Sequence, residues 1–443
     1  MLGWVLGLAA VRAASPNASR AALETLLRDP TAEEWGALSR FDFAVTREDF
    51  VARLETVFDP ARGLRPYLRV SAVQVEVYAT PRCEGRPVAV FRFRQAPAAS
   101  PSFPPLFRRA GAPAAVPHPT AGLPLAGLRV AIDPADIGGS WAKMEDRSVE
   151  FRGFGRINEG DLNLVVGEIL RDELTRDGAS VFLVRQRAEP VLALSRSDAE
   201  RAAEAMLRTR PSLLPGMFRN PDGTQGTDSP GRLRAAADML LTKTAEARAR
   251  AACLRRSFHP DITIVLQFDA TPESTRGLLT RVNRNIFFLD GAYLPAELGD
   301  PSQRFRLLTK LLENVTPAEA AVADSISECF RTATGFPPVL YGNSANTRLV
   351  LPNNPYVVSR NLELNRDHDG PVVVTEPYFM NQPETLARLL AGDFLGKRQV
   401  AGKLRASIFR EYAGCVVAGL VAVYHPAALP GPDGELTLNR GLR

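Results

Sequence analysis

Three apolar segments that end on polar or acidic residues constrain the fold of this 443-residue chain more than any other feature. They cover residues 128–139, 261–269 and 371–376. Each has the composition of a strand buried on both faces, because short runs of Val, Ile and Leu bounded by turn residues are typical of such strands. Ligands of open α/β sheets bind outside the carboxyl ends of the strands. We therefore expect a functional site where these segments end.

Helical and strand patterns alternate from residue 128 onward. This alternation predicts an α/β fold with a central, mostly parallel twisted sheet and helices on both faces. Two helices are expected after the last strand. The predicted strands are 128–133, 179–185, 261–268, 285–289 and 371–376, and the predicted helices between them are 159–176, 196–208, 231–256 and 303–335.

The chain divides by composition into five parts. Residues 18–95 have helical and then strand-like patterns, which predict a small α+β module in front of the sheet. Residues 1–17 contain an apolar stretch with the length of a signal core but without basic residues. The protein is expected in the periplasm or outside the cell if this stretch is a signal, and in the cytoplasm otherwise. The remaining parts are a Pro/Ala-rich linker at 96–126, an α/β domain at 127–425 with an insertion at about 209–232, and a loose tail at 426–443.

Charge and cysteine content exclude several classes of function. The net charge of +5 comes from scattered arginines, and no basic run interleaved with aromatic residues predicts nucleic-acid binding. No stretch reaches the ~18 apolar residues of a membrane span. The four cysteines form no Cys-x-x-Cys pair, so we expect buried free thiols and neither a zinc knuckle nor a redox motif.

Four acidic residues near the strand ends could carry chemistry. Glu159 falls in the first turn of its predicted helix, at the positive end of the helix dipole. Glu376 follows three valines and precedes a proline, so partial desolvation should raise its pKa toward the range of a general base. Asp133 and Asp136 precede Pro and Ile-Gly, where aspartate also serves as an ordinary turn residue. Taken singly, all four can be read as ordinary turn or surface acids.

Motifs in a fixed order resemble one known family. Ile-Asp-Pro-Ala-Asp-Ile-Gly-Gly at 132–139 is followed by Glu-Gly-Asp-Leu-Asn-Leu at 159–164 and Gly-Ala-Ser-Val-Phe-Leu-Val-Arg at 178–185. The segment 261–270 and Val-Val-Val-Thr-Glu-Pro-Tyr-Phe-Met-Asn at 372–381 come next. Together these motifs resemble the zinc-dependent N-acetylmuramoyl-L-alanine amidases of bacterial cell walls.

The resemblance covers roughly residues 125–425 and implies a set of site residues. The loop Gly-Gly-Ser-Trp-Ala-Lys-Met-Glu at 138–145 is similar to a divergent branch of the family. In the family, two histidines and a glutamate hold zinc, and a second glutamate is the general base. The carry-over makes Glu159 a metal ligand and Glu376 the base, but Asp136 and Gln267 stand at the two histidine positions. By position alone, Arg360 and Asn346 would bind substrate.

Because both histidines are replaced, the sequence leaves open which metal the site would hold, or whether it holds one. Asp136, Glu159 and Gln267 offer only oxygen, which suits Mg²⁺, Mn²⁺ or Ca²⁺ better than the zinc that the resemblance implies. None of the four histidines is placed to substitute, and His259 is expected at the surface. Three converging carboxylates need a cation. If an arginine is that cation, the site holds no metal cofactor and is inactive. The arginines that could take this role are Arg185, Arg187, Arg360 and Arg366.

Two functions therefore remain, and whether the chain is an enzyme stays open. The first is an amidase-like cell-wall hydrolase that uses metal-assisted amide hydrolysis with Glu376 as general base. The second is a catalytically inactive amidase-fold protein that binds peptidoglycan, a muropeptide or a partner protein. A hydrolase with altered metal use that acts on another amide is a third possibility.

Overall fold

The computed structural model describes residues 16–95, 107–108, 122–192, 194, 196–209, 229–341 and 346–425. Most of the predicted signal segment and insertion, and the predicted tail, lie outside the described residues. The chain forms two compact units. One comprises Met1–Arg28 and Pro190–Ala249, and the other comprises Asp29–Glu189 and Arg250–Arg443.

A seven-stranded sheet forms the centre of the second unit, with strand order β10-β11-β9-β12-β8-β4-β7. The strands β12, β8, β4 and β7 run parallel to one another, whereas β9 runs antiparallel to β12 and parallel to β11. Every residue of β8 and β9 is buried, as expected for strands covered on both faces. The α/β prediction is confirmed. The strands are β4 (Arg129–Pro134), β7 (Ser180–Leu183), β8 (Ile262–Leu266), β9 (Ile286–Asp290), β10 (Thr347–Leu349), β11 (Val357–Arg360) and β12 (Val372–Glu376).

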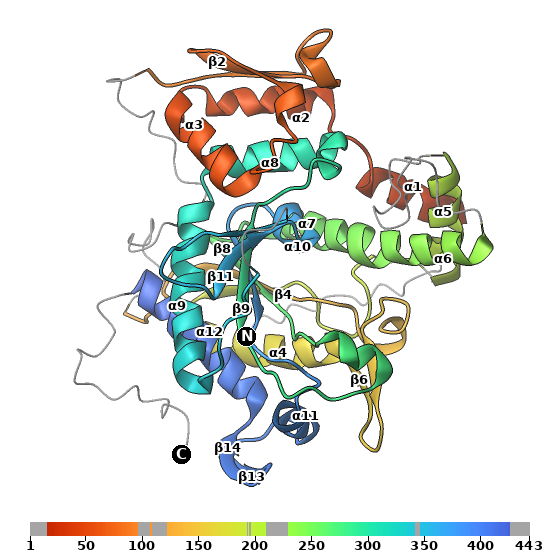
Figure 1. Ribbon diagram of the computed structural model, residues 1–443, viewed down its shortest axis with the longest axis vertical. Coiled ribbons are helices and arrows are strands. Elements are labelled where there is room, and N and C mark those ends of the chain that lie inside the picture. Colours follow the sequence, from red (N-terminus) through yellow and green to blue (C-terminus); the bar gives the residue numbers. More distant parts are fainter. Residues whose placement is uncertain are drawn as a thin grey trace, which may run out of the picture. The chain divides into compact units, whose positions relative to one another are not determined.

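Helices α4 (Glu159–Arg176), α9 (Thr316–Thr334) and α12 (Ile408–Tyr424) share one apolar core with the sheet (Figure 1). A smaller cluster on β8, β9, β11 and β12 packs against the chain near Tyr341 and against α10 (Glu363–Asp367). The helical stretches predicted at 303–335 form two helices, because Asn314 adopts a left-handed conformation between α8 (Pro301–Glu313) and α9. Shorter elements follow the last strand: α11 (Pro383–Leu390), β13 (Lys397–Val400) and β14 (Lys403–Ala406).

Residues 29–95 of the predicted module belong to the second compact unit. Its three-stranded sheet of β1 (Leu68–Val70), β2 (Gln74–Val77) and β3 (Ala89–Arg92) is present, with α2 (Ala32–Gly36) and α3 (Arg47–Arg53). However, its apolar core is continuous with α8, and the Trp35 ring meets the Phe305 ring edge-on at 5.2 Å. Because these residues share one buried apolar core with α8, they belong to the same compact unit as the seven-stranded sheet.

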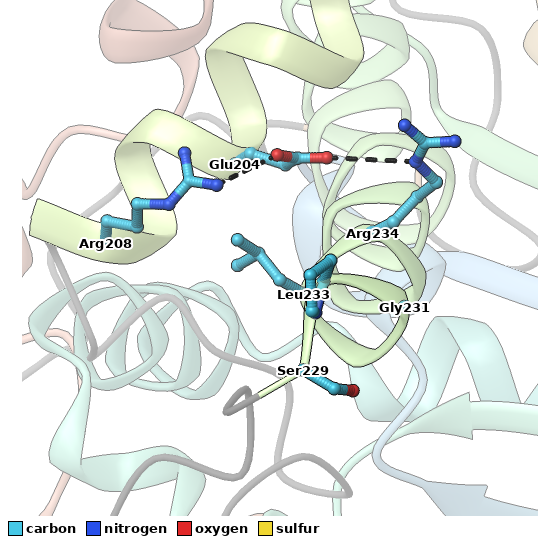
Figure 2. Close-up of a pocket in the computed structure, with 7 residues that line it drawn as sticks. Glu204, Arg208, Ser229, Gly231, Leu233 and Arg234 are labelled. Atoms are coloured by element: carbon cyan, nitrogen blue, oxygen red, sulfur yellow. Dashed lines mark hydrogen bonds and ion pairs between the residues drawn. The ribbon is translucent and has the colours of Figure 1, made fainter.

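The other unit is helical in its described part. It contains α1 (Pro16–Leu26), α5 (Arg196–Thr209), α6 (Pro230–Met239), a π-helical turn at Leu240–Ala245 and the start of α7 (Glu246–Ser257). A pocket of about 540 Å³ opens between α5 and α6 (Figure 2). Glu204 pairs there with Arg208 at 3.1 Å and Arg234 at 3.9 Å. Among the described residues, no helix has the length and apolar character needed to cross a membrane.

A buried acid on α9 gives the second unit a pH-dependent stability. Glu319 is 0% exposed, and its Oε1 accepts the Val372 N–H at 2.9 Å. Desolvation raises its pKa to about 8; Lys310 lowers that pKa, and Asp290 raises it further. Because the folded-state pKa is raised, the stabilisation is complete below the unfolded value near 4.5 and is lost as pH rises through about 8.

We therefore expect Glu319→Gln to be nearly neutral at pH 5 and to raise the free energy of unfolding at pH 8. The expected gain is about 2–5 kcal/mol, since one pKa unit corresponds to about 1.4 kcal/mol. Urea unfolding of both proteins between pH 5 and pH 9 measures it. Glu328→Gln, an exposed acid on the same helix, is the matched control and should show no such trend. A constant difference between wild type and Glu319→Gln across this range would contradict the assignment.

Candidate functional site: a carboxylate and arginine cluster

The predicted strand ends lie beside one another in the sheet. Pro134 of β4 and Thr375 of β12 both pair in register with Leu266 of β8. The chain therefore leaves three adjacent strands toward Asp136, Gln267 and Glu376 at one edge. Glu159, the first residue of α4, joins them because its Oε1 accepts the Phe268 N–H at 3.2 Å.

The loop after β4 is held by its backbone. Asp136 has a positive φ of 57°. A Cβ on Gly160 would lie 2.4 Å from the Gly138 nitrogen, so only glycine permits this approach of α4 to the loop. Arg185 donates hydrogen bonds to the carbonyl oxygens of Pro134, Asp136 and Ile137 at 3.1, 2.6 and 2.8 Å. Arg185 therefore orders the loop backbone that carries Asp136.

Arg147 is the cation beside the two acids at this edge. Its Nε lies 3.2 Å from Asp136 Oδ1 and 3.7 Å from Glu159 Oε2. The Asp136 and Glu159 side chains are 3% and 5% exposed, whereas that of Arg147 is 43% exposed. The pKa of Arg147 is raised, first by Asp136 and Glu159 and then, after an opposing desolvation effect, by Glu145 and Glu376.

The backbone explains why Arg147 reaches this place. Its carbonyl oxygen accepts the Glu159 N–H at 3.1 Å, and its own N–H bonds the Ala142 carbonyl at 2.8 Å. A hairpin of β5 (Ser148–Phe151) and β6 (Gly155–Asn158) then connects Arg147 to α4. The arginines named from sequence were others. The sequence signal that could have identified Arg147 was this short hairpin, which brings the chain back to Glu159. We did not predict the hairpin.

Burial raises the pKa values of three acids at this edge. Desolvation raises the pKa of Glu159 well above its usual range; the Asp136 charge raises it further, and the Arg147 charge opposes the rise. Desolvation and then Asp269 also raise the pKa of Glu376, which Arg360 and Arg147 oppose. Asp269, whose pKa is likewise raised by desolvation, was not among the predicted site residues. Asp269 lies two residues after Gln267, and residues two apart on a strand lie on the same face, which is the signal that could have indicated it.

The remaining predicted residues lie around these acids. The Gln267 carbonyl accepts a hydrogen bond from the Tyr412 hydroxyl at 3.0 Å. Gln267 comes directly after the last residue of β8 and is partly buried. Arg360 donates from Nη1 to the Tyr341 hydroxyl at 3.1 Å and stacks over that ring at 5.3 Å. The charge of Arg360 lowers the pKa of Glu376. Asn346 lies in the turn immediately before β10.

The residues of this cluster do not fit a divalent metal ion in the observed arrangement. Arg147 already supplies positive charge to Asp136 and Glu159. Within the described part of the chain, no group of three His, Cys, Asp or Glu side chains is arranged to hold a metal. A bound divalent ion would have to displace a guanidinium that two buried carboxylates stabilise.

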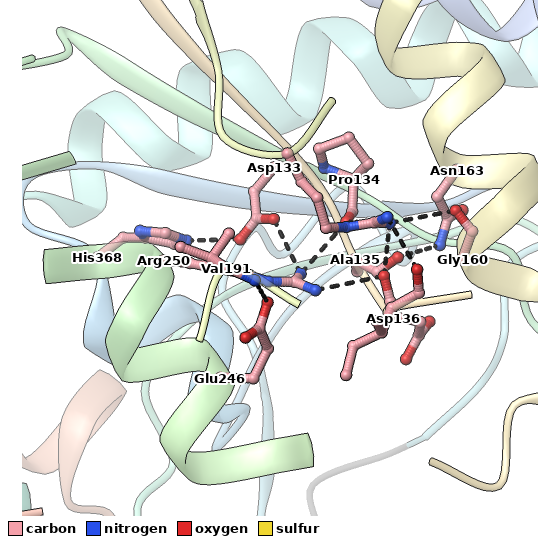
Figure 3. Close-up of polar contacts among 12 residues, drawn as sticks. Asp133, Pro134, Ala135, Asp136, Gly160, Asn163, Val191, Glu246, Arg250 and His368 are labelled. Carbon is pink, nitrogen blue, oxygen red and sulfur yellow. Dashed lines mark hydrogen bonds and ion pairs between the residues drawn. The ribbon is translucent and has the colours of Figure 1, made fainter. Parts of the chain in front are cut away.

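A second ionic cluster lies beneath the same loop (Figure 3). Asp133 is 0% exposed; its Oδ1 pairs with Arg250 Nη1 at 3.0 Å and its Oδ2 with His368 Nε2 at 2.8 Å. Arg250 also donates to the carbonyl oxygens of Pro134 and Asp136. Asp133 and His368 are both buried and paired, so Asp133 is not the ordinary turn residue that its sequence context also allowed. His259 is exposed, as predicted.

Comparison with known proteins gives a likeness in fold. No family model matches the chain, and no curated protein sequence matches it. The chain is similar to N-acetylmuramoyl-L-alanine amidases. The amidase Ami1 from Mycobacterium smegmatis is 15% identical with a TM-score of 0.34, and the match covers 67% of this chain and 97% of Ami1.

Two further amidase structures match over a similar share of the chain. AmiC2 of Nostoc punctiforme is 12% identical with a TM-score of 0.32, covering 66% of this chain and 95% of AmiC2. The catalytic domain of CwlV from Bacillus (Paenibacillus) polymyxa var. colistinus is 11% identical with a TM-score of 0.33, covering 66% and 96%. At such identities the likeness concerns the fold alone, so function has to be inferred from the site residues themselves.

Proposed function

We propose that this chain is an amidase-fold protein that binds peptidoglycan or a muropeptide without hydrolysing it through a metal. The observation that carries the proposal is the position of Arg147, with its Nε 3.2 Å from Asp136 and 3.7 Å from Glu159. These are two of the three residues that the family resemblance assigns to the metal. The third, Gln267, offers a neutral carboxamide in place of an imidazole.

The chemistry of the cluster suits a peptide ligand. Arg147 and Arg360 can pair with a carboxylate or a carbonyl oxygen, and the acids around Glu376 can receive amide N–H groups or an amine. The raised pKa of Glu376 also allows its carboxyl group to donate a hydrogen bond. The stem peptide of peptidoglycan offers groups of both kinds, and the motif resemblance favours it over other peptides.

Metal content, release of stem peptide and binding to peptidoglycan are the three properties that test this function. Elemental analysis of protein purified without metal affinity should find far less than one zinc per chain. Incubation with purified peptidoglycan should release no stem peptide, whereas cosedimentation should show binding. Arg360→Gln should weaken binding roughly tenfold through the loss of a charge-assisted hydrogen bond. Arg398→Gln, on β13, is the control and should bind as wild type does. Stoichiometric zinc together with released stem peptide would refute the proposal.

One observation favours a second function, which is retained amide hydrolysis. Desolvation and Asp269 raise the pKa of Glu376 well above its usual range, as a general base requires. If hydrolysis occurs, Glu376→Gln should abolish the release of stem peptide while leaving cosedimentation intact. Loss of both properties would instead indicate that Glu376 binds the ligand.

A further inference from the structure

The contact between α9 and α12 is close enough for short side chains to meet across it. The two helices lie side by side (Figure 1) and bury a common apolar core. A Cβ added to Gly419 of α12 would lie 2.8 Å from the Ile326 Cα and 2.9 Å from its nitrogen. The helix backbones therefore touch at Gly419, where no side chain separates them.

Two cysteines flank this point of contact. Cys415 lies one helical turn before Gly419 on α12, and Cys329 lies about one turn after Ile326 on α9. When two helices pack antiparallel, positions displaced in opposite directions from the crossing point face each other. The Phe330 ring of α9 and the Tyr412 ring of α12 lie 5.4 Å apart. Cys329 therefore lies between Ile326 and Phe330, and Cys415 lies between Tyr412 and Gly419, so the two helices run antiparallel and place the two cysteines opposite each other. The other two cysteines, Cys83 and Cys253, lie on different elements.

We propose that Cys329 and Cys415 form a modification site, a thiol pair that a disulfide oxidant converts into a cross-link between α9 and α12. The two residues are far apart in sequence and form no Cys-x-x-Cys motif, so only the packing of the helices brings them together. The suitable oxidant is a small-molecule disulfide or the reactive disulfide of an oxidising protein.

The two thiols differ in a way that orders the reaction. The interaction with Cys415 lowers the pKa of the Cys329 thiol, and the same interaction together with burial raises the pKa of Cys415. Cys329 is also the more exposed of the two. Cys329 is therefore expected to react first, because the thiolate is the nucleophile.

The atoms and electrons balance over two exchange steps. The Cys329 thiolate attacks one sulfur of the oxidant and forms a mixed disulfide, and the first oxidant thiol leaves. Cys415 then gives its proton to solvent and attacks the Cys329 sulfur, which releases the second oxidant thiol. The protein loses two protons and two electrons, and the oxidant disulfide takes them up and becomes two thiols.

Oxidation of the purified full-length chain with oxidised glutathione tests this assignment. Intact mass should fall by about 2 Da, and alkylation after denaturation should modify two of the four cysteines. Peptide mapping should recover the peptides of Cys329 and Cys415 joined. The oxidised protein should also melt about 5 °C higher, since the bond closes a long loop.

Single substitutions provide the controls. Cys329→Ser and Cys415→Ser should each abolish the mass loss and the shift in Tm. Cys83→Ser and Cys253→Ser should retain both. Four alkylated cysteines in oxidised wild-type protein, or a joined peptide that contains Cys83 or Cys253, would overturn the proposal. Mapping of the wild-type chain alone decides the matter if a serine variant fails to fold.

Discussion

Combining Arg147→Ala with Asp136→His and Gln267→His is expected to create a zinc site in this chain. The three changes remove the resident cation and place two imidazoles beside the Glu159 carboxylate, a ligand set that binds catalytic zinc. Histidine also tolerates the positive φ of 57° at position 136 better than most residues. Titration with zinc, followed by calorimetry and elemental analysis, should show one zinc per chain bound at least about a hundredfold more tightly than by wild type.

The double variant Asp136→His and Gln267→His, with Arg147 retained, is the decisive control. Two unit positive charges about 4 Å apart repel by roughly 4 kcal/mol at an effective dielectric constant of 20, and zinc carries two charges. The double variant should therefore bind zinc at least about a hundredfold more weakly than the triple variant. Equal zinc affinity in the two variants would show that Arg147 does not stand where a metal would bind.

The sequence predicted the sheet and its functional edge because both depend on local patterns. Apolar runs that end on Asp136, Gln267 and Glu376 are recognisable without knowledge of their neighbours. In a sheet where β12, β8 and β4 are adjacent and parallel, such runs must end at one edge. The long periodic helix 159–176 was predicted with the bounds found in the structure for the same reason.

Contacts between residues distant in sequence were not predictable in this way. Arg147 carries no motif, and it reaches Glu159 only because a hairpin of short strands pairs its backbone with the start of α4. His368 lies in a polar segment, yet tertiary packing buries it against Asp133, 235 positions away. The sequence indicated that the converging acids need a cation, but the identity of that arginine depends on three-dimensional packing.

Asp133→Asn is expected to lower the free energy of unfolding by about 3–5 kcal/mol, because it removes the buried carboxylate that pairs with both Arg250 and His368. The side chains of Arg250 and Asp133 are 2% and 0% exposed, so solvent offers no compensation. Urea unfolding at pH 7 measures the change. Asp172→Asn removes a carboxylate that is 63% exposed on α4 and should change stability by less than about 0.5 kcal/mol.

The pH dependence and a double-mutant cycle identify the cause of that loss. Desolvation would raise the pKa of Asp133, but Arg250, His368 and Arg185 outweigh it and the pKa is lowered. Stabilisation by Asp133 is thus present above its unfolded pKa of about 3.9 and is lost as pH falls through the lower folded value. The gap between wild type and Asp133→Asn should stay constant from pH 5 to 7 and narrow below pH 4.

Arg250→Met added to Asp133→Asn should recover roughly 2 kcal/mol, because it removes the buried positive charge that Asp133 neutralises in the wild type. Strictly additive losses in the double variant would show that the two residues do not stabilise each other. Arg250 also donates to the Asp136 carbonyl, so the same variants should loosen the loop that presents Asp136 to Arg147. Hydrogen exchange at the amides of residues 135–139 should then rise in Asp133→Asn but not in Asp172→Asn. The buried ion pair would in that case support the functional edge as well as the stability of the fold.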